Sequence, residues 1–198
     1  MEPTLLADDA SAYLAADEAV DHEHPHVRAV ADRLAAEHGD DAYTYAEAAF
    51  AYVRDRIPHS RDTGDRRVTW RASDALALGT GICHAKAHAL AALLRARSIP
   101  AALCYQKFEV VHGLIAVRLP GGGGWVRQDP RGGAAGAAAR FRTDREQVAF
   151  TVRPEFDEAD YPALYAAPHP LVLDALKAAR DRSHLEALLP THLPPTRA

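Results

Sequence analysis

The chain has 198 residues, 48% hydrophobic and 25% charged, which suits one soluble domain and excludes a disordered or fibrous protein. Its net charge of −4 argues against nucleic-acid or anionic-membrane partners, and no apolar stretch approaches the roughly 20 residues of a membrane helix. The N-terminus lacks a secretory signal pattern and only two cysteines are present, so we expect a cytoplasmic protein without disulfides.

Residues 1–40 are predicted to form a helical extension that packs on a domain covering residues 41–198. Apolar residues at helical spacing indicate helices over 5–20 and 27–36. Between these helices lie three alternating histidines, a pattern that occurs in metal sites: His22, His24 and His26. Because Pro25 is typical of a helix start, we favour a solvated helix cap and expect no metal.

A helix is predicted over residues 43–57, and Pro58 ends it. A second helix is predicted over residues 73–78, with Ser73 as its expected cap. A longer helix is predicted over residues 83–97. Its apolar positions recur at steps of four, three and four residues and form one buried stripe: Cys83, Ala87, Leu90 and Leu94.

After Pro100 the pattern becomes extended, and three strands are predicted: 101–106, 110–119 and 125–128. The glycines at 121–124 indicate a hairpin turn, since no Lys-Ser/Thr pair and no helix follow them as in a phosphate loop. A small-residue loop (132–138), a further strand (148–152), a last helix (171–180) and a proline-rich tail complete the prediction. Helices followed by an antiparallel meander indicate an α+β fold.

Cys83 is the candidate nucleophile. A thiol attacks a carbonyl as the thiolate, and the free N–H groups and positive dipole end of a helix's first turn favour that anion. Gly79 and Gly81 let the chain turn tightly into this helix and leave the sulfur uncovered.

His112 and Asp129 are the candidate base and orienting carboxylate. If their two strands pair through the 121–124 turn, the imidazole of His112 gains a carboxylate neighbour. Such a carboxylate would hold the ring and stabilise the imidazolium, which in turn would hold the thiolate of Cys83. Spacing alone leaves open that Cys83 and His112 are ordinary packed residues.

The run from Gly79 to Pro100 resembles the transglutaminase-like superfamily, whose pattern is Gly-x-Cys, an Ala-rich helix and Leu-Leu-Arg-Ala-x-Gly-Ile-Pro. Three later motifs are similar to its stand-alone bacterial branch: Cys104-Tyr-Gln106, His112-Gly-Leu and Gln128-Asp-Pro-Arg-Gly132. The resemblance implies a papain-like α+β fold, a nucleophile helix packed on an antiparallel sheet, and a triad of Cys83, His112 and Asp129.

Four other residues are candidates for supporting roles. Gln106 and Trp70 could assist an oxyanion or cover the site with an aromatic ring, although each could equally be packing. Arg127 and Arg131 flank Asp129 and could bind a substrate carboxylate, although pairing with surface acids is favoured.

Three further residues are expected to be structural. His84 and His88 lie four residues apart and could share a metal, but no acidic ligand is near them in sequence, so we expect a surface or partly packed position. Cys104 lies in an apolar strand and is predicted to be core.

We therefore expect a metal- and cofactor-independent enzyme that transfers acyl groups at amide bonds of a peptide or an amide-containing small molecule. Hydrolysis is the favoured outcome, and acyl transfer to an amine, as in a transglutaminase or amide-forming acyltransferase, is the alternative. A non-catalytic protein-binding module on the same fold is the further alternative.

Overall fold

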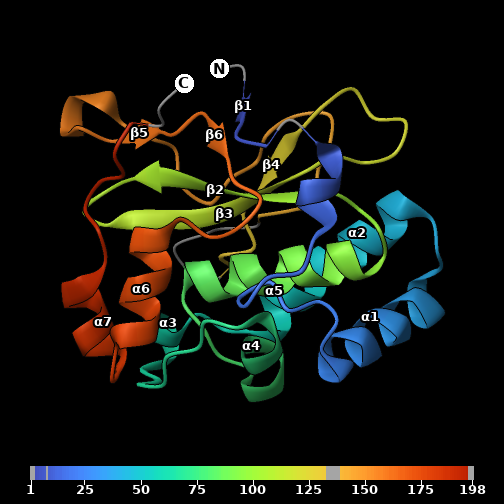
Figure 1. Ribbon diagram of the computed structural model, residues 1–198, viewed down its shortest axis with the longest axis horizontal. Helices are drawn as coiled ribbons and strands as arrows, with labels where there is room; N and C mark the ends of the chain where they lie inside the picture. The colour runs from blue at the N-terminus through green and yellow to red at the C-terminus, as the bar shows by residue number, and fades with distance from the viewer. Residues whose placement is uncertain (1–2, 8, 133–138, 196–198) are drawn as a thin grey trace.

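The computed structural model describes residues 3–7, 9–132 and 139–195, and a central helix lies against a small sheet with other helices around it (Figure 1). The helices are α1 (Pro25–His38), α2 (Ala42–Arg56), α3 (Ser60–Thr63), α4 (Ala72–Leu78), α5 (Cys83–Ala96), α6 (Pro170–Ala178) and α7 (Arg182–Leu188), with short 3₁₀ helices at Ala10–Leu14 and Pro154–Phe156. The strands are β1 (Thr4–Leu5), β2 (Ala101–Lys107), β3 (Val111–Val117), β4 (Val126–Gln128), β5 (Ala159–Asp160) and β6 (Ala163–Leu164).

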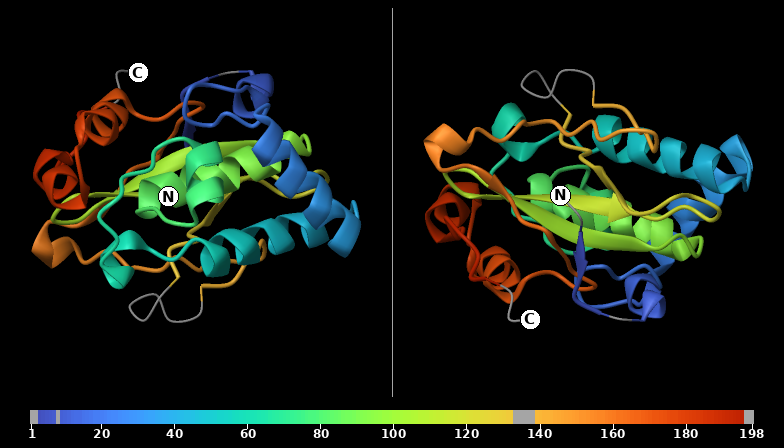
Figure 2. Two further views of the ribbon diagram at one scale, coloured as in Figure 1. Left: turned by 90° about the horizontal axis from the view of Figure 1, so that it is seen from below. Right: turned by 90° about the horizontal axis from the view of Figure 1, so that it is seen from above.

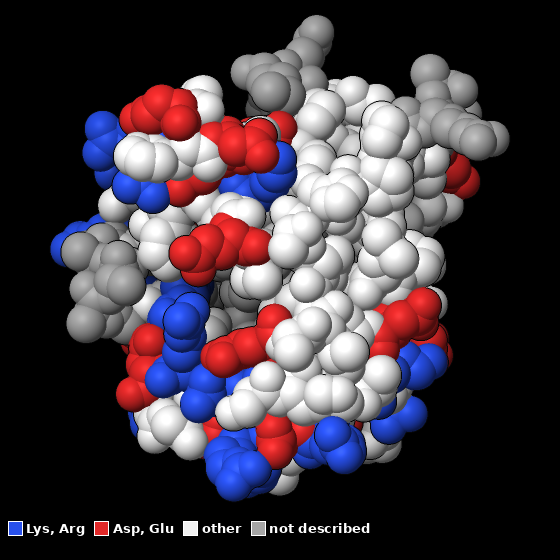
Figure 3. All heavy atoms as spheres, turned by 90° about the vertical axis from the view of Figure 1, so that its left-hand side faces the viewer, with Lys and Arg blue, Asp and Glu red and all other residues white. Residues whose placement is uncertain are grey.

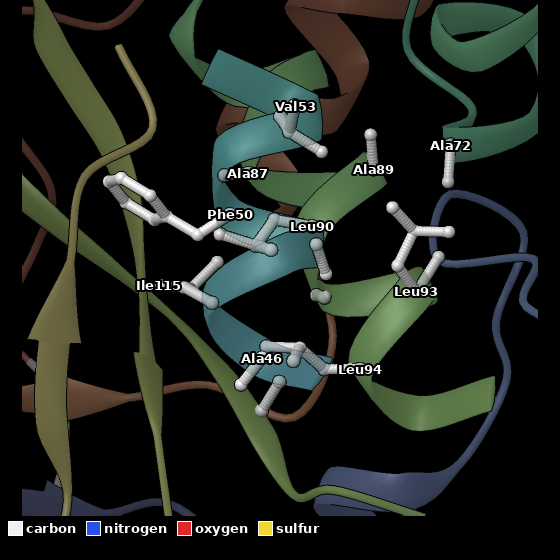
Figure 4. Close-up of a cluster of buried hydrophobic side chains, with 14 of the residues drawn as sticks. Ala46, Phe50, Val53, Ala72, Ala87, Ala89, Leu90, Leu93, Leu94 and Ile115 are labelled. Carbon is white, nitrogen blue, oxygen red and sulfur yellow. The ribbon is translucent and has the colours of Figure 1, made fainter. Parts of the chain in front are cut away.

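Helix α5 is the centre of the fold because nearly all its residues are buried. It packs against β2 and β3 on one side and against α1, α2 and α4 on the other. Figure 4 shows Leu90 and Leu94 of this helix near side chains of α2, with Ile115 of β3 nearby. Leu93 lies on the other side, toward Ala72 of α4. One continuous core therefore joins the helices to the sheet.

The main sheet has the strand order β4-β3-β2-β5, and every neighbouring pair is antiparallel. Its strands confirm the predicted meander, with β3 and β4 joined through the glycine-rich turn. In this register His112 of β3 lies opposite Gln106 of β2, and Ile115 lies opposite Gln128. The α+β fold class is thereby confirmed.

The histidine-rich segment before α1 is a helix cap, as predicted. The side chain of His24 accepts a hydrogen bond from the backbone N–H of His26, at 3.2 Å, and Pro25 is the first helical residue. Helix α1 packs on α5 within the same core as α2. The division of the chain at residue 40 remains a prediction.

The prediction of a helix over residues 5–20 was wrong. The structure has β1, paired in parallel with β6, followed by a single 3₁₀ turn capped by Asp9. The side chain of Asp17 accepts hydrogen bonds from the N–H groups of Ala19 and Val20, at 2.7 and 2.8 Å. These local carboxylate contacts replace the helical ladder that the alanine-rich spacing indicated.

Three smaller predictions also need correction. Residues 148–152 form no strand, because the Ala149 N–H donates to the Asp129 carboxylate instead of to a neighbouring strand. The cap of α4 is Arg71, while Ser73 bonds the carboxylate of Asp21. The tail contains an additional helix, α7, capped by Asp181. Most of the predicted loop at 132–138 lies outside the described residues.

The two ends of the molecule are built differently, as both views of Figure 2 show. Helices α1 and α2 lie at one end, and α6 and α7 lie at the other. The apolar faces of α6 and α7 pack with Tyr105 and Val111 in a separate cluster beside the sheet. No helix within the described ranges is long and apolar enough to cross a membrane.

Candidate active site

Cys83 is the first residue of α5, and its side chain is half-buried. The backbone that leads into this helix is tightly packed, since a Cβ on Gly81 would lie 2.9 Å from Ala85 Cβ and 3.0 Å from Thr69 Oγ1. The helical ladder begins with the N–H of Lys86, which donates to Ile82 O at 3.0 Å. The sulfur therefore lies at the end of a 14-residue helix where free N–H groups favour negative charge.

His112, near the start of β3, is joined to Asp129, which directly follows β4. His112 Nε2 lies 2.8 Å from Asp129 Oδ2. Asp129 is fully buried, and its two oxygens also accept hydrogen bonds from the N–H groups of Arg131, at 3.0 Å, and Ala149, at 3.2 Å. These donors hold the carboxylate in position, and His112 and Cys83 both line one cleft.

The electrostatics favour a charged pair. Burial raises the pKa of the Cys83 thiol, but interactions with His84 and His112, and hydrogen bonds from His112 and His59, hold this pKa well below its usual range. Burial likewise lowers the pKa of His112, but Asp129 and Cys83 outweigh it and raise the pKa above its usual value. These shifts favour a proton on the His112 ring and a thiolate at Cys83.

His59, which the sequence analysis missed, lines the same cleft as Cys83 and contributes to the lowered pKa of its thiol. It lies just before α3, and its backbone pairs with Gly81, two residues ahead of the nucleophile. The segment around His59 carries no motif at a distinctive spacing, so no sequence signal identified it. Tertiary packing brings it to the site.

A cleft of about 510 Å³ gives access to these groups, and it is lined by His59, Cys83, His112 and Arg131. Its walls are mainly apolar and include Ile82, Phe108, Val110, Phe150 and Leu189. Figure 3 shows the end of the molecule near α7, where acidic and basic side chains gather around a hollow beside a broad uncharged area. An uncharged substrate segment could pack on these walls with its carbonyl at the sulfur.

The two candidate arginines occupy different places. Arg131 lines the cleft, but its guanidinium is held by both carboxylate oxygens of Asp62, at 2.6 and 2.9 Å. Arg127 lies outside the cleft and binds the carboxylates of Glu146 and Asp160. Both arginines therefore pair with acids, and the structure brings only Arg131 to the site.

Neither Gln106 nor Trp70 lines the cleft. The Gln106 amide donates to Asp160 Oδ1, at 2.8 Å, and to Phe150 O, at 3.3 Å, so its N–H groups are already engaged. The Trp70 ring lies beneath the Arg71 guanidinium, 4.2 Å from the ring centroid. Both residues therefore lie outside the cleft and are engaged with other partners.

His84 and His88 are fully buried, in contrast to the expected surface or partly packed position. His84 Nε2 lies 3.0 Å from Val111 O, and His88 Nδ1 lies 2.7 Å from Trp70 O, so each ring ties α5 to a neighbouring segment. Burial lowers the pKa of His88 to about 4. Within residues 3–7, 9–132 and 139–195 no cluster of three potential metal ligands occurs.

Cys104 is buried in β2, as predicted. Burial raises the pKa of its thiol above the usual range, which keeps the sulfur protonated. The two cysteines thus differ in environment, because Cys83 lines an open cleft beside His112 whereas Cys104 is fully buried.

Comparison with known proteins bears on the family and the fold of the chain. A search of curated proteins found no match. Among solved structures, the crystal structure of a "Putative Cysteine Protease" from Cytophaga hutchinsonii is similar in fold, with a TM-score of 0.50 and 20% identity. That similarity covers 64% of this chain and 43% of the other. The model of the transglutaminase-like superfamily matches residues 28–130, more than half of the sequence and including Cys83, His112 and Asp129, and the chain therefore belongs to this superfamily.

Proposed function

We propose that this protein is a cysteine-dependent enzyme that cleaves amide bonds through an acyl-thioester on Cys83, with His112 as acid and base and Asp129 as the orienting carboxylate. The observation that carries the proposal is the buried 2.8 Å contact of His112 with Asp129, next to a half-buried thiol at a helix start. A structural cysteine would need neither a cationic partner nor an open cleft.

The proposed reaction has two halves. The Cys83 thiolate attacks the carbonyl carbon, and the carbonyl π electrons move to oxygen. As the oxyanion collapses, the C–N bond breaks and the His112 imidazolium gives its proton to the leaving amine. His112, now neutral, then takes a proton from a water that attacks the thioester, and the acid product leaves with the thiolate restored.

Hydrolysis is the proposed main outcome because water needs no second binding site. Transfer to an amine uses the same acyl-thioester, with His112 taking a proton from the attacking amine instead. The substrate class is a peptide or an amide-containing small molecule, since the cleft has mainly apolar walls and includes Cys83 in its lining. A reducing compartment such as the cytoplasm suits a reactive free thiol.

The test uses a set of peptide and small-molecule anilides with the wild-type protein and Cys83→Ala. We expect turnover by the wild type, an acyl adduct on Cys83 in mass spectra of acid-quenched samples, and loss of both in Cys83→Ala. Adding hydroxylamine separates the outcomes, because hydroxamate would form at the expense of free acid if amines compete with water.

Cys104→Ala is the matched control, since this second thiol is buried and away from the cleft. It should retain both turnover and adduct. Equal turnover in Cys83→Ala, or an adduct on another residue, would contradict the proposal. Absence of any adduct across the substrate set would favour a non-catalytic binding module.

A further inference from the structure

His59 is anchored beside the nucleophile by the backbone. Its backbone forms a bridge with Gly81, and the N–H of Ser60 donates to Gly81 O at 3.0 Å. His59 is 8% exposed and lines the same cleft as Cys83. A movement of this segment would therefore move the entry to α5 as well.

The hydrogen bonds of His59 define its tautomer. Nδ1 accepts a hydrogen bond from the backbone N–H of Arg61, at 3.2 Å, so this nitrogen carries no proton. The proton of the neutral ring is then on Nε2, which carries the N–H left for the cleft that His59 and Cys83 both line. His59 thus presents one N–H donor to the thiolate.

The two imidazoles at the sulfur are not equivalent. His112 is paired with a buried carboxylate, which supports the imidazolium, whereas His59 is paired with an N–H donor, which requires an unprotonated Nδ1. His112 can therefore exchange a proton during the reaction. His59 is suited to donate a hydrogen bond from Nε2.

We propose that His59 is the side-chain donor of the oxyanion hole, and that its Nε2–H binds the carbonyl oxygen when Cys83 attacks. The inference rests on the proposed function. The oxyanion forms on the carbon bonded to Sγ, so a donor that reaches the sulfur reaches this oxygen with little movement. His59 keeps its proton throughout, while the leaving amine takes its proton from His112.

Two reagents separate this role from a structural one. Acetylation of Cys83 by p-nitrophenyl acetate passes through an oxyanion, whereas alkylation by iodoacetamide displaces iodide at a saturated carbon and forms none. The ratio of the two rate constants corrects for the fraction of thiolate. In His59→Leu we expect this ratio to fall about 100-fold, the usual effect of losing one oxyanion donor.

His59→Gln places an amide N–H near the position of Nε2 and should keep the ratio within about 10-fold of the wild type. His59→Phe retains a ring of similar shape without a donor, so it tests the same loss if His59→Leu does not fold. His38→Leu, at an exposed position outside the cleft, should leave the ratio unchanged.

An unchanged ratio in both donor-free variants, including a parallel fall of both rates, would overturn the role of His59 while leaving the proposed function intact. Failure of the proposed function itself would give a different result from failure of the His59 role alone. If wild-type protein is acetylated no faster than Cys83→Ala, there is no acyl-enzyme on Cys83, and both proposals fall.

Discussion

At the residue scale, the proposed reaction depends on the proton shared between Cys83 and His112. The pKa of the thiol is lowered and that of the imidazole is raised, so the thiolate and imidazolium coexist over the pH range between them. Asp129 sustains this state because its buried carboxylate stabilises the cation. A neutral ring at position 112 would not hold the thiolate.

We predict that His112→Ala slows alkylation of Cys83 by iodoacetamide about 10- to 100-fold near pH 6.5, because the thiol pKa returns toward ~8.5. The alkylation rates of the two proteins should converge above about pH 8.5, where both thiols are ionised. The check is a pH–rate profile from pH 5 to 10. Identical profiles would show that His112 does not control the sulfur.

At the scale of elements, α5 and β3 approach so closely that only glycine fits between them. A Cβ on Gly113 would lie 2.3 Å from Nδ1 of His84, the residue after Cys83. We predict that Gly113→Ala lowers the free energy of unfolding by about 1–3 kcal/mol, the usual effect of overpacking. Urea titration measures this change, and Gly123→Ala, which has open space, should change it by less than about 0.5 kcal/mol.

Lys86 joins α5 to the end of α2. Its ammonium is buried and donates to the carbonyl oxygens of Arg54, at 3.2 Å, and Ile57. Burial, with a smaller effect of Arg131 in the same direction, lowers the pKa of Lys86 to about 8. The folded protein therefore releases this proton at lower pH than the unfolded chain, whose lysines titrate near 10.4.

It follows that the stability of the wild type relative to Lys86→Met rises with pH from about 8 to 10, by about 1.4 kcal/mol per unit. Below pH 8 the difference should be flat, because Lys86 is protonated in both states. Urea unfolding of both proteins across this range tests the sign. A difference that is constant up to pH 10 would contradict the lowered pKa.

At the scale of the whole molecule, the C-terminal segment completes one wall of the cleft. Leu189 and Glu186 line that cleft, and the Val111 N–H, next to His112, donates to Pro190 O at 2.8 Å. Leu185 of α7 is buried in the cluster that contains Tyr105. The segment thus belongs to the same packed unit as the sheet.

We predict that Leu185→Ala lowers the free energy of unfolding by about 2–5 kcal/mol. Leu188→Ala, in the same helix but 38% exposed, should cost less than about 1 kcal/mol. Denaturant unfolding followed by both far-UV circular dichroism and tryptophan fluorescence provides the measurement. A separate early transition in Leu185→Ala would show that α7 unfolds independently of the core.

Local patterns in the sequence were sufficient to predict the helix that begins at Cys83, the antiparallel strands and the approach of His112 to Asp129. Each depends on spacing along one element or on pairing of strands that are neighbours in sequence. The same local logic failed for residues 5–20, where carboxylate contacts to the backbone replaced the helix. The catalytic role of the three residues remains a prediction.

Only the tertiary structure decided which side chains surround the sulfur. His59 reaches Cys83 through a bridge between segments 22 residues apart, whereas Gln106 and Trp70 are held elsewhere by their own partners. The burial of His84, His88 and Lys86 likewise depends on segments that pack on α5 from several directions. Such contacts join residues distant in sequence, so no local periodicity encodes them.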